Sequence, residues 1–346
     1  MVRKFTLVDL WSTTMVLIEN RWLRVFAVVA IVGLGCNSLP TDPENGVTPD
    51  SEDVSGPTDS ENGVTPDSED VSEPTDNGSL ELFDFHAHQM PSTYPENWLD
   101  DLFSANDLKG IALLGIGDVF THQRNRPSVV YAFSNFKDVN NIDLAEVESQ
   151  LEKGSRGIGE VSIRHFASGP PPAVAVENDF NEPDLLKLYD LAKQYNVPVN
   201  FHFDYHEDHV DEIMVTLPAY PDVKFVWAHA GDAQPEQLAP LLGQFDNLYI
   251  DISSRNPLES FQGRLLSTDL QRLDDQDGII KAEWKRLFSD HADRVLYGSD
   301  IGPKGRIEQY DQIEEYYRGI LMQVDAHIAE KIAYSNAEKI FRFSGQ

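Results

Sequence analysis

Residues 80–346 predict an α/β fold of the (β/α)8 or TIM-barrel class, for two reasons. Short apolar runs alternate with polar, helix-forming segments, and the length of 80–346 is close to the roughly 250 residues of a typical barrel of this class. The runs that we expect to be the eight strands are 80–86, 110–116, 128–133, 156–163, 197–203, 223–229, 247–252 and 294–300.

Helices are expected between the later strands. Residues 182–195 carry apolar side chains at helical spacing, with Asn181 as the expected N-cap and Pro183 in the first turn. A second helix is expected over 235–244. A helix over 326–341 is expected to close one end of the barrel.

Four of the expected strands end on a side chain that can bind a metal ion. They read LELFDFHAH at 80–88, VPVNFH at 197–202, VKFVWAH at 223–229 and RVLYGSD at 294–300. Because side chains alternate along a strand, His86 and His88 are expected to point one way, and Phe85 and Ala87 the other. Parallel barrels carry their active sites at the C-terminal strand ends. The sequence therefore predicts a metal ion at the mouth of the barrel.

Composition narrows the kind of site and the partners. The chain has a single cysteine, Cys36, which excludes an intramolecular disulfide and a thiolate metal cluster. The ligands must then be His, Asp and Glu, which suits a catalytic zinc, manganese or iron ion better than a closed structural zinc site. The formal net charge is −31, and such a surface makes nucleic acid a poor partner.

The first 79 residues differ in composition from the rest. Residues 1–36 predict a signal peptide, because Arg21 and Arg24 precede the apolar run VFAVVAIVGLG at 25–35, which is too short to span a bilayer. The run ends at Cys36 in the manner of a bacterial lipobox, although Gly33 stands where Leu is usual. We expect lipid attachment there, and a location in the bacterial cell envelope.

Residues 37–79 contain an acidic tandem repeat. PTDPENGVTPDSEDVSG at 40–56 recurs as PTDSENGVTPDSEDVSE at 57–73. The repeat has almost no large apolar side chains with which to offset chain entropy, so a disordered linker is expected. Its expected role is to hold the domain at 80–346 away from a membrane surface.

The ordered motifs FDFHAH, GIGE, VNFH, VWAHAG, LYGSD and NAEKIF resemble the amidohydrolase superfamily, in its amidohydrolase-related branch of metal-dependent hydrolases and decarboxylases. The resemblance covers essentially all of 80–346. It implies one or two divalent ions, with zinc expected first and manganese or iron as alternatives. A carbamylated-lysine bridge is excluded, since residue 160 is not lysine.

The resemblance also implies a role for each residue. His86, His88 and Asp300 match metal ligands, and Asp300 also matches the residue that moves a proton. His202 matches a further ligand. His229 matches either a ligand of a second ion or a catalytic base. Glu160 matches an acid between two ions.

Other interpretations of these and neighbouring residues stay open. Glu160 could instead pair with Arg164 or Arg156. Residues 158, 160, 162 and 164 are expected to share one strand face, which the resemblance places inward. Further candidates are Arg164 and His165 for a substrate carboxylate, His206 and His209 for a lid, Asp204 and Asp251 behind the ligands, and His122 at the pocket entry.

We therefore expect a metal-dependent hydrolase of a small-molecule amide, ester or lactone. The same branch makes a non-oxidative decarboxylase of an aromatic acid the first alternative. A metal-dependent nuclease is disfavoured by the acidic surface. A tethered metal- or solute-binding lipoprotein without catalytic activity is the remaining alternative.

Overall fold

The computed structural model describes residues 80–89, 97–115, 117–136, 138–165, 176–258, 260–261, 264–265, 269–302 and 304–342. The expected signal peptide, 1–36, and the expected acidic linker, 37–79, lie outside the described residues. Within the described part, no helix is both long and apolar enough to cross a bilayer.

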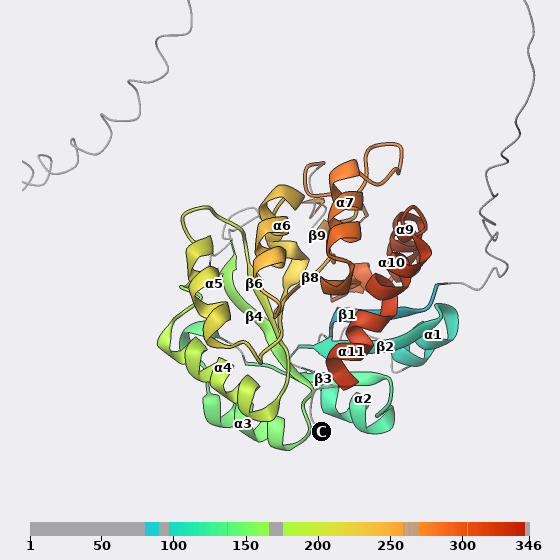
Figure 1. Cartoon of the computed structure of the whole chain (residues 1–346). Coiled ribbons are helices and arrows are strands. Elements are labelled where there is room, and N and C mark those ends of the chain that lie inside the picture. Colours follow the sequence, from blue (N-terminus) through green and yellow to red (C-terminus); the bar gives the residue numbers. More distant parts are fainter. Residues whose placement is uncertain are drawn as a thin grey trace, which may run out of the picture. The chain divides into compact units, whose positions relative to one another are not determined.

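Eight parallel strands form a barrel in chain order, as the sequence predicts (Figure 1). They are β1 (Leu82–His88), β2 (Leu108–Leu114), β3 (Val130–Ser134), β4 (Gly157–His165), β6 (Val199–Phe203), β7 (Phe225–Trp227), β8 (Leu248–Asp251) and β11 (Val295–Leu296). The circle closes between the last strand segment and β1. There, Ala87 pairs with Ile301, and the amide of Phe85 donates to the carbonyl of Tyr297 at 3.0 Å.

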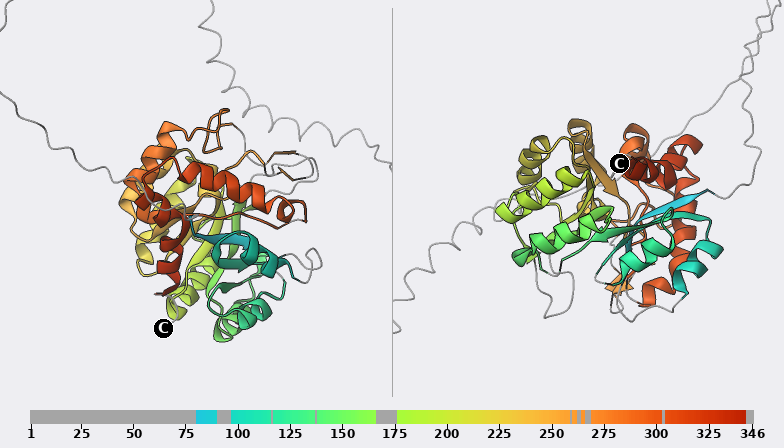
Figure 2. Two further views of the ribbon diagram at one scale, coloured as in Figure 1. Left: turned by 90° about the vertical axis from the view of Figure 1, so that its right-hand side faces the viewer. Right: turned by 90° about the horizontal axis from the view of Figure 1, so that it is seen from below.

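Helices surround the strands (Figure 2). They are α1 (Trp98–Ala105), α2 (Val119–Asn125), α3 (Leu144–Glu152), α4 (Pro183–Tyr195), α5 (Val210–Thr216), α6 (Pro235–Gln244), α7 (Ala282–Asp290), α8 (Lys304–Ile307) and α9 (Tyr310–Leu321). Short helical turns are η1 (Val139–Asn141), η2 (Leu217–Ala219), η3 (Ala228–Asp232) and η4 (Ala292–Arg294), and short strands are β5 (Val176–Glu177), β9 (Ser260–Phe261) and β10 (Arg264–Leu265). Helix α4 begins one residue later than expected: its N-cap is Glu182, not Asn181, and Pro183 opens the helix.

The described part of the chain ends, at Arg342, in a continuous helical segment that closes one end of the barrel. It consists of α10 (Ala326–Glu330), the π-helical η5 (Lys331–Ser335) and α11 (Asn336–Arg342), in agreement with the helix expected over 326–341. The ring of Phe341 stacks on Tyr131 at 4.2 Å and on Phe83 and Phe85 at 5.4 Å each. Phe83, Phe85 and Phe133 belong to one buried apolar cluster inside the barrel, and Tyr131 packs against it.

Two expected strand faces are wrong, and both errors come from strand irregularities. Phe85 lies in the inner cluster with Phe83, whereas Ala87 lies in the outer cluster between strands and helices, because the register of β1 shifts between Asp84 and Ala87. His86 and His88 still face the same way. In β4, register shifts flank 159–160 and 163, so Ile158 packs in the outer cluster and does not share the face of Glu160.

Candidate metal centre

Six side chains from five strand ends converge at the mouth of the barrel. His86 and His88 come from β1, Glu160 from β4 and His202 from β6; His229 lies in η3 directly after β7, and Asp300 follows β11. These are the six residues that the sequence predicts. We refer to them together as the donor set.

One half of the donor set is built around β1. The Nε2 atoms of His86 and His88 lie 3.0 Å apart. The Oδ1 of Asp300 lies 3.7 Å from Nε2 of His86 and 3.3 Å from Nε2 of His88, and the Oε2 of Glu160 lies at the same two distances. Four donor atoms from three strands therefore face a common point.

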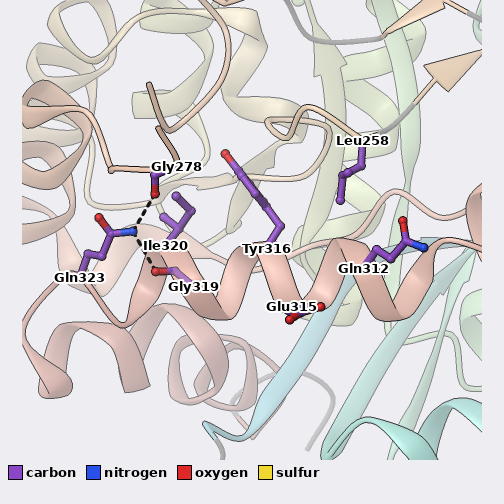
Figure 3. Close-up of a pocket in the computed structure, with 8 residues that line it drawn as sticks. All are labelled: Leu258, Gly278, Gln312, Glu315, Tyr316, Gly319, Ile320 and Gln323. Atoms are coloured by element: carbon purple, nitrogen blue, oxygen red, sulfur yellow. Dashed lines mark hydrogen bonds between the residues drawn. The ribbon is translucent and has the colours of Figure 1, made fainter. Parts of the chain in front are cut away.

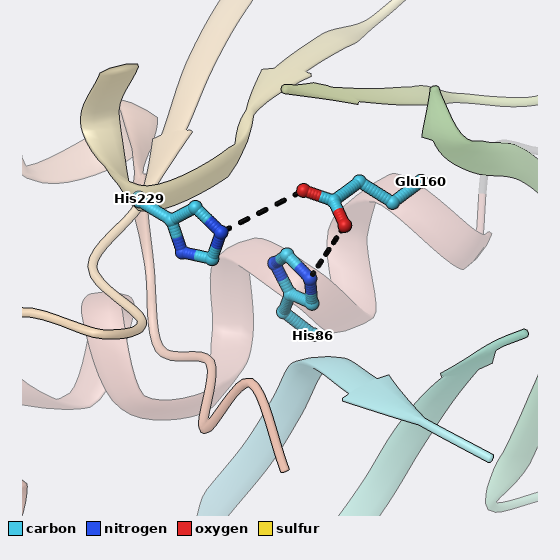
Figure 4. Close-up of side chains that lie close together, drawn as sticks. All are labelled: His86, Glu160 and His229. Carbon is cyan, nitrogen blue, oxygen red and sulfur yellow. Dashed lines mark ion pairs between the residues drawn. The ribbon is translucent and has the colours of Figure 1, made fainter. Parts of the chain in front are cut away.

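The other half is built around the second oxygen of Glu160. Its Oε1 lies 2.8 Å from Nδ1 of His202 and 3.6 Å from Nε2 of His229. Figure 4 shows the carboxylate between His86 and His229, with one oxygen turned to each ring. Glu160 thus joins the two halves through its two oxygens, and it does not pair with Arg156 or Arg164 through any contact that the structure describes.

Asp251 is a buried acceptor behind the donor set. Its Oδ2 accepts from Nδ1 of His86 at 3.1 Å and from the amide of Asn200 at 3.2 Å. Its Oδ1 accepts from the backbone amide of His229 at 3.0 Å and from the hydroxyl of Ser253. One carboxylate at the end of β8 therefore orients residues from β1, β6 and the β7 end.

The histidines outside β1 are also held from behind. The Nε2 of His202 donates to Oδ1 of Asp204 at 2.9 Å, and the other oxygen of Asp204 lies 3.3 Å from Nδ1 of His165. The Nδ1 of His229 lies 2.8 Å from the hydroxyl of Ser253. Because that hydroxyl donates to Asp251, it accepts from His229.

In each of His86, His202 and His229, one ring N–H therefore donates to a protein acceptor, and the other ring nitrogen faces the donor set. In the neutral ring, that second nitrogen carries a lone pair. An acceptor that fixes the tautomer in this way is the usual arrangement behind metal-binding histidines.

Asp300 is fixed by two groups on its outer oxygen. The Oδ2 accepts from the hydroxyl of Ser254 at 2.7 Å and from Nη1 of Arg306 at 2.5 Å, which leaves Oδ1 facing His86 and His88. The backbone is unusual here. Asp300, Ser254 and His229 have φ of 52°, 55° and 55°, in the left-handed region that costs non-glycine residues free energy.

The electrostatics of the donor set favour positive charge. Burial alone lowers the pKa of His86, but the carboxylates of Asp251 and Glu160 outweigh it and raise that pKa well above 6.5. Burial likewise opposes Asp204 and Glu160 at His202, whose pKa is also raised well above 6.5. Burial raises the pKa of Glu160, but hydrogen bonds with the surrounding histidines hold it well below 4.5.

The donor set fits a divalent metal ion. Donors about 2.0–2.1 Å from a tetrahedral ion are separated by roughly 3.3 Å, close to the 3.0–3.7 Å spacings around His86 and His88. The ligand types, imidazole and carboxylate, suit zinc, manganese or iron. His86, His88 and Asp300 form one candidate group, and His86, Glu160 and His229 form another.

Several other sequence candidates lie away from the donor set. Arg164 is buried on the outer side of β4, where it donates to the carbonyl of Asn178 at 3.1 Å and lies over the ring of Phe203. The side chains of His206 and His209 contact each other near the start of α5. His122 in α2 contacts Gln89.

A separate groove of about 490 Å³ lies along α9 (Figure 3). It is lined by Leu258, Tyr316, Ile320 and Gln323 among others, and by none of the donor set. Gln323 spans it by donating to the carbonyls of Gly278 and Gly319 at 3.1 and 2.9 Å. The donor set, and not this groove, is the candidate active site.

Sequence reasoning did not single out Ser253, Ser254, Arg255 or Arg306. The first three follow directly on β8 in the run DISSR, so a polar run just past a strand end was the available signal. Arg306 lies six residues beyond Asp300 in α8, where no spacing pattern marks it.

The sequence profile of the amidohydrolase family matches residues 142–343, which is more than half of the chain. The chain belongs to the amidohydrolase family. No curated protein matches it in sequence. The family assignment places the chain among enzymes, in the branch that the strand-end motifs indicate.

Solved structures share the fold at low sequence identity. An uncharacterised TIM-barrel protein of Bordetella bronchiseptica is 14% identical, covering 77% of this chain and 100% of its own, with a TM-score of 0.55. A probable 2-pyrone-4,6-dicarboxylic acid hydrolase of Acinetobacter baumannii is 14% identical over 76% and 100%, with a TM-score of 0.51. A β-aspartyl dipeptidase of Fervidobacterium islandicum is 14% identical over 76% and 73%, also with a TM-score of 0.51.

Proposed function

We propose that this amidohydrolase is a metal-dependent hydrolase of an amide, ester or lactone bond in a small organic molecule. The supporting observation is the common orientation of His86, His202 and His229, each hydrogen-bonded from behind and turned to the carboxylates of the donor set. His86, His88 and Asp300 would hold one ion. His202 and His229 would hold a second, with Glu160 between them.

A divalent ion bound there supplies Lewis acidity, which acidifies water and polarises a carbonyl group. The chain supplies the proton transfer. Oδ1 of Asp300 faces the donor set and can accept a proton from water, because Oδ2 is occupied by Arg306 and Ser254. Asp300 would then pass this proton to the leaving group, while Ser254 and Arg306 keep its outer oxygen in place.

The contacts of His229 favour hydrolysis over decarboxylation. A decarboxylase of this branch would need His229 or Asp300 to deliver a proton to carbon. His229 has its N–H on Ser253 and turns Nε2 to Glu160, so it presents no proton toward a substrate. Decarboxylation would then depend on Asp300 alone.

Turnover by the purified protein on lactones, esters, amides and aromatic acids tests this proposal. We expect hydrolysis that a chelator abolishes and that added zinc, manganese or iron restores. Asp300→Asn keeps the size but removes the base, so turnover should fall by a factor on the order of 10²–10⁴.

The other outcomes count against the proposal. Release of carbon dioxide from an aromatic acid without hydrolysis would identify a decarboxylase. Metal binding without any turnover would identify a binding protein. Activity of Asp300→Asn within about threefold of the parent would remove Asp300 from the mechanism.

We also propose that the enzyme works in the bacterial cell envelope, attached through a lipid on Cys36 and held off the membrane by the acidic linker. The support is the sequence alone: the apolar run before Cys36 and the repeat at 40–73.

A further inference from the structure

The turn that carries His229 has a backbone of unusual hand. Four consecutive residues, His229, Ala230, Gly231 and Asp232, have φ of 55°, 50°, 60° and 54°. Left-handed geometry is unfavourable for each of the three non-glycine residues, and runs of it are rare. Something in the surrounding structure must therefore hold the turn in place.

Arg255 contacts this turn through three hydrogen bonds. Its side chain is completely buried, and its guanidinium lies over the ring of Trp284 at 5.0 Å. Nε donates to the carbonyl of His229 at 2.9 Å, and Nη2 donates to the carbonyls of Ala230 and Ala233 at 3.3 and 2.9 Å. Three carbonyls of one short segment are thus gathered on one planar cation.

The fourth contact ties the turn to a distant segment. Nη1 of Arg255 donates to the carbonyl of Gln271 at 3.0 Å. Arg255 lies four residues after the end of β8. The last residue of β8, Asp251, accepts from the backbone amide of His229. Both backbone polar groups of His229 are therefore fixed: its N–H donates to Asp251, and its C=O accepts from Arg255.

Gly231 gives the turn its close approach to the barrel wall. A Cβ at this position would lie 2.3 Å from the ring of Trp227, and its φ of 60° favours glycine. The carbonyl of Gly231 accepts from the amide of Tyr205 at 2.7 Å. The turn is thus packed on one side and drawn toward Arg255 on the other.

We propose that Arg255 is a positioning residue for His229. It fixes the left-handed turn so that Nε2 of His229 faces Oε1 of Glu160, and its loss weakens the His202–His229 half of the donor set. The proposal rests on the proposed function only in taking that half to be a metal site. Among the contacts that the structure describes, Arg255 reaches the donor set only through the backbone carbonyl of His229, and it contacts no donor side chain.

The test compares Arg255→Met and Arg255→Lys with a matched control, Arg156→Met. Arg156 also donates to a backbone carbonyl, that of Phe341 at 3.0 Å, and lies over an aromatic ring, that of Tyr131 at 5.9 Å. The readouts are crystal structures, metal content per chain and zinc affinity by chelator competition. None of them depends on turnover, so failure of the hydrolase proposal would not be mistaken for failure of this one.

In both Arg255 variants we expect the turn to leave the left-handed region, and Nε2 of His229 to move away from Glu160. Zinc affinity at the His202–His229 half of the donor set should fall at least tenfold. His86, His88 and Asp300 should keep their geometry. Lysine keeps the charge, but its donors radiate from one nitrogen and cannot span the four carbonyls that Arg255 reaches from Nε, Nη1 and Nη2, so it should not rescue. Arg156→Met should lower stability without changing metal content or His229.

If Arg255→Met fails to fold, the same measurements on Arg255→Lys still test the proposal. An unmoved His229 ring together with parental zinc affinity in either folded Arg255 variant would overturn the proposal. So would full rescue by lysine, since charge and not the fork would then be the cause. If the parent holds a single ion, the position of His229 in the crystals decides.

Discussion

Three of the four donor histidines, His86, His202 and His229, are each fixed by a specific acceptor behind the ring, and this orientation is what makes the cluster a candidate metal site. A lone buried histidine is most often satisfied by its neighbours. Here the Nε2 atoms of His86 and His88 lie 3.0 Å apart, with carboxylate oxygens on both sides. Burial lowers the pKa of both histidines, but the neighbouring carboxylates, Asp251 and Glu160 at His86 and Asp300 and Glu160 at His88, raise it above 6.5.

The double change His86→Ala with His88→Ala should therefore remove most of the bound metal. Two of the ring nitrogens that face Asp300 would be gone, and the remaining donors would face only half of a site. Metal content of the purified protein, prepared without chelator, measures the effect. The matched control is His206→Ala with His209→Ala, two partly exposed histidines outside the donor set. Parental metal content in the first variant would rule out the site.

Glu160→Gln tests whether one carboxylate joins two ions. The side chain keeps its shape, but one oxygen becomes an NH2 group that cannot bind a cation, and a negative charge between two dications is lost. We expect metal content to fall toward one ion per chain, with partial loss of activity. A parent that holds one ion, with no change in Glu160→Gln, would establish a mononuclear site.

At the level of elements, the sequence predicts the strands better than their faces. The apolar runs ending in His86, His202, His229 and Asp300 are local signals, because a strand end at the barrel mouth needs both an apolar run and a polar terminus. The inward position of Phe85 is not local. It follows from the register shift in β1, which is set by pairing with β2 and the closing segment.

The residues that hold the donor set in place from behind could not be predicted from the sequence, for a related reason. Ser253 and Arg255 contact His229, and Arg306 contacts Asp300; both of these partners have left-handed backbone conformations. For Ser253 and Arg255 the partner is also more than 20 residues away in the sequence. No spacing pattern encodes such contacts. Asp204 and Asp251, which sit at or next to strand ends, could be proposed from position alone.

Helix α11 should contribute stability without contributing to the site. Phe341 is buried against Tyr131, Phe83 and Phe85 at the end of the barrel opposite the donor set. Phe341→Ala should lower the free energy of unfolding by about 3–5 kcal/mol, the usual cost of removing a large buried ring. Urea unfolding measures it, with the exposed neighbour Arg342→Ala as control.

Metal content should be unchanged in folded Phe341→Ala, because its contacts lie with the inner apolar cluster and not with the donor set. A loss of metal comparable to that of the His86 and His88 change would mean that the two ends of the barrel are coupled. An unfolding free energy within about 1 kcal/mol of the parent would mean that α11 is not part of the cooperative core.

At the scale of the whole molecule, the proposed attachment to the cell envelope predicts how the protein should fractionate. Cys36→Ser in the full chain should move the protein from the membrane fraction to the soluble fraction or block signal processing, because no thiol remains to carry a lipid. One acyl chain alone binds a membrane only marginally, so stable attachment implies more than one. Unchanged membrane attachment in the variant would point to retention by the apolar run at 25–35 instead.

The stability of the barrel should also depend on pH through Glu314 of α9. This side chain is 3% exposed; Arg318 donates to its Oε1, and its Oε2 has no hydrogen-bond partner among the described residues. Burial raises its pKa from 4.5 to about 7 despite Arg318. The folded state therefore favours the protonated form, and this contribution to stability is fully present below about pH 4.5 and is lost as pH rises through about 7.

Glu314→Gln replaces the carboxyl with a group that does not ionise, so the part of the pH dependence due to Glu314 should disappear. We expect the urea midpoint of the parent to fall more steeply than that of the variant between pH 5 and pH 8, both saturated with metal. Glu315→Gln removes an exposed acid from the same helix turn and should follow the parent. The parent and Glu314→Gln share every titrating group except Glu314. Parallel curves for these two proteins would therefore show that Glu314 is ionised in the folded state at no cost, and that burial on α9 does not control its protonation.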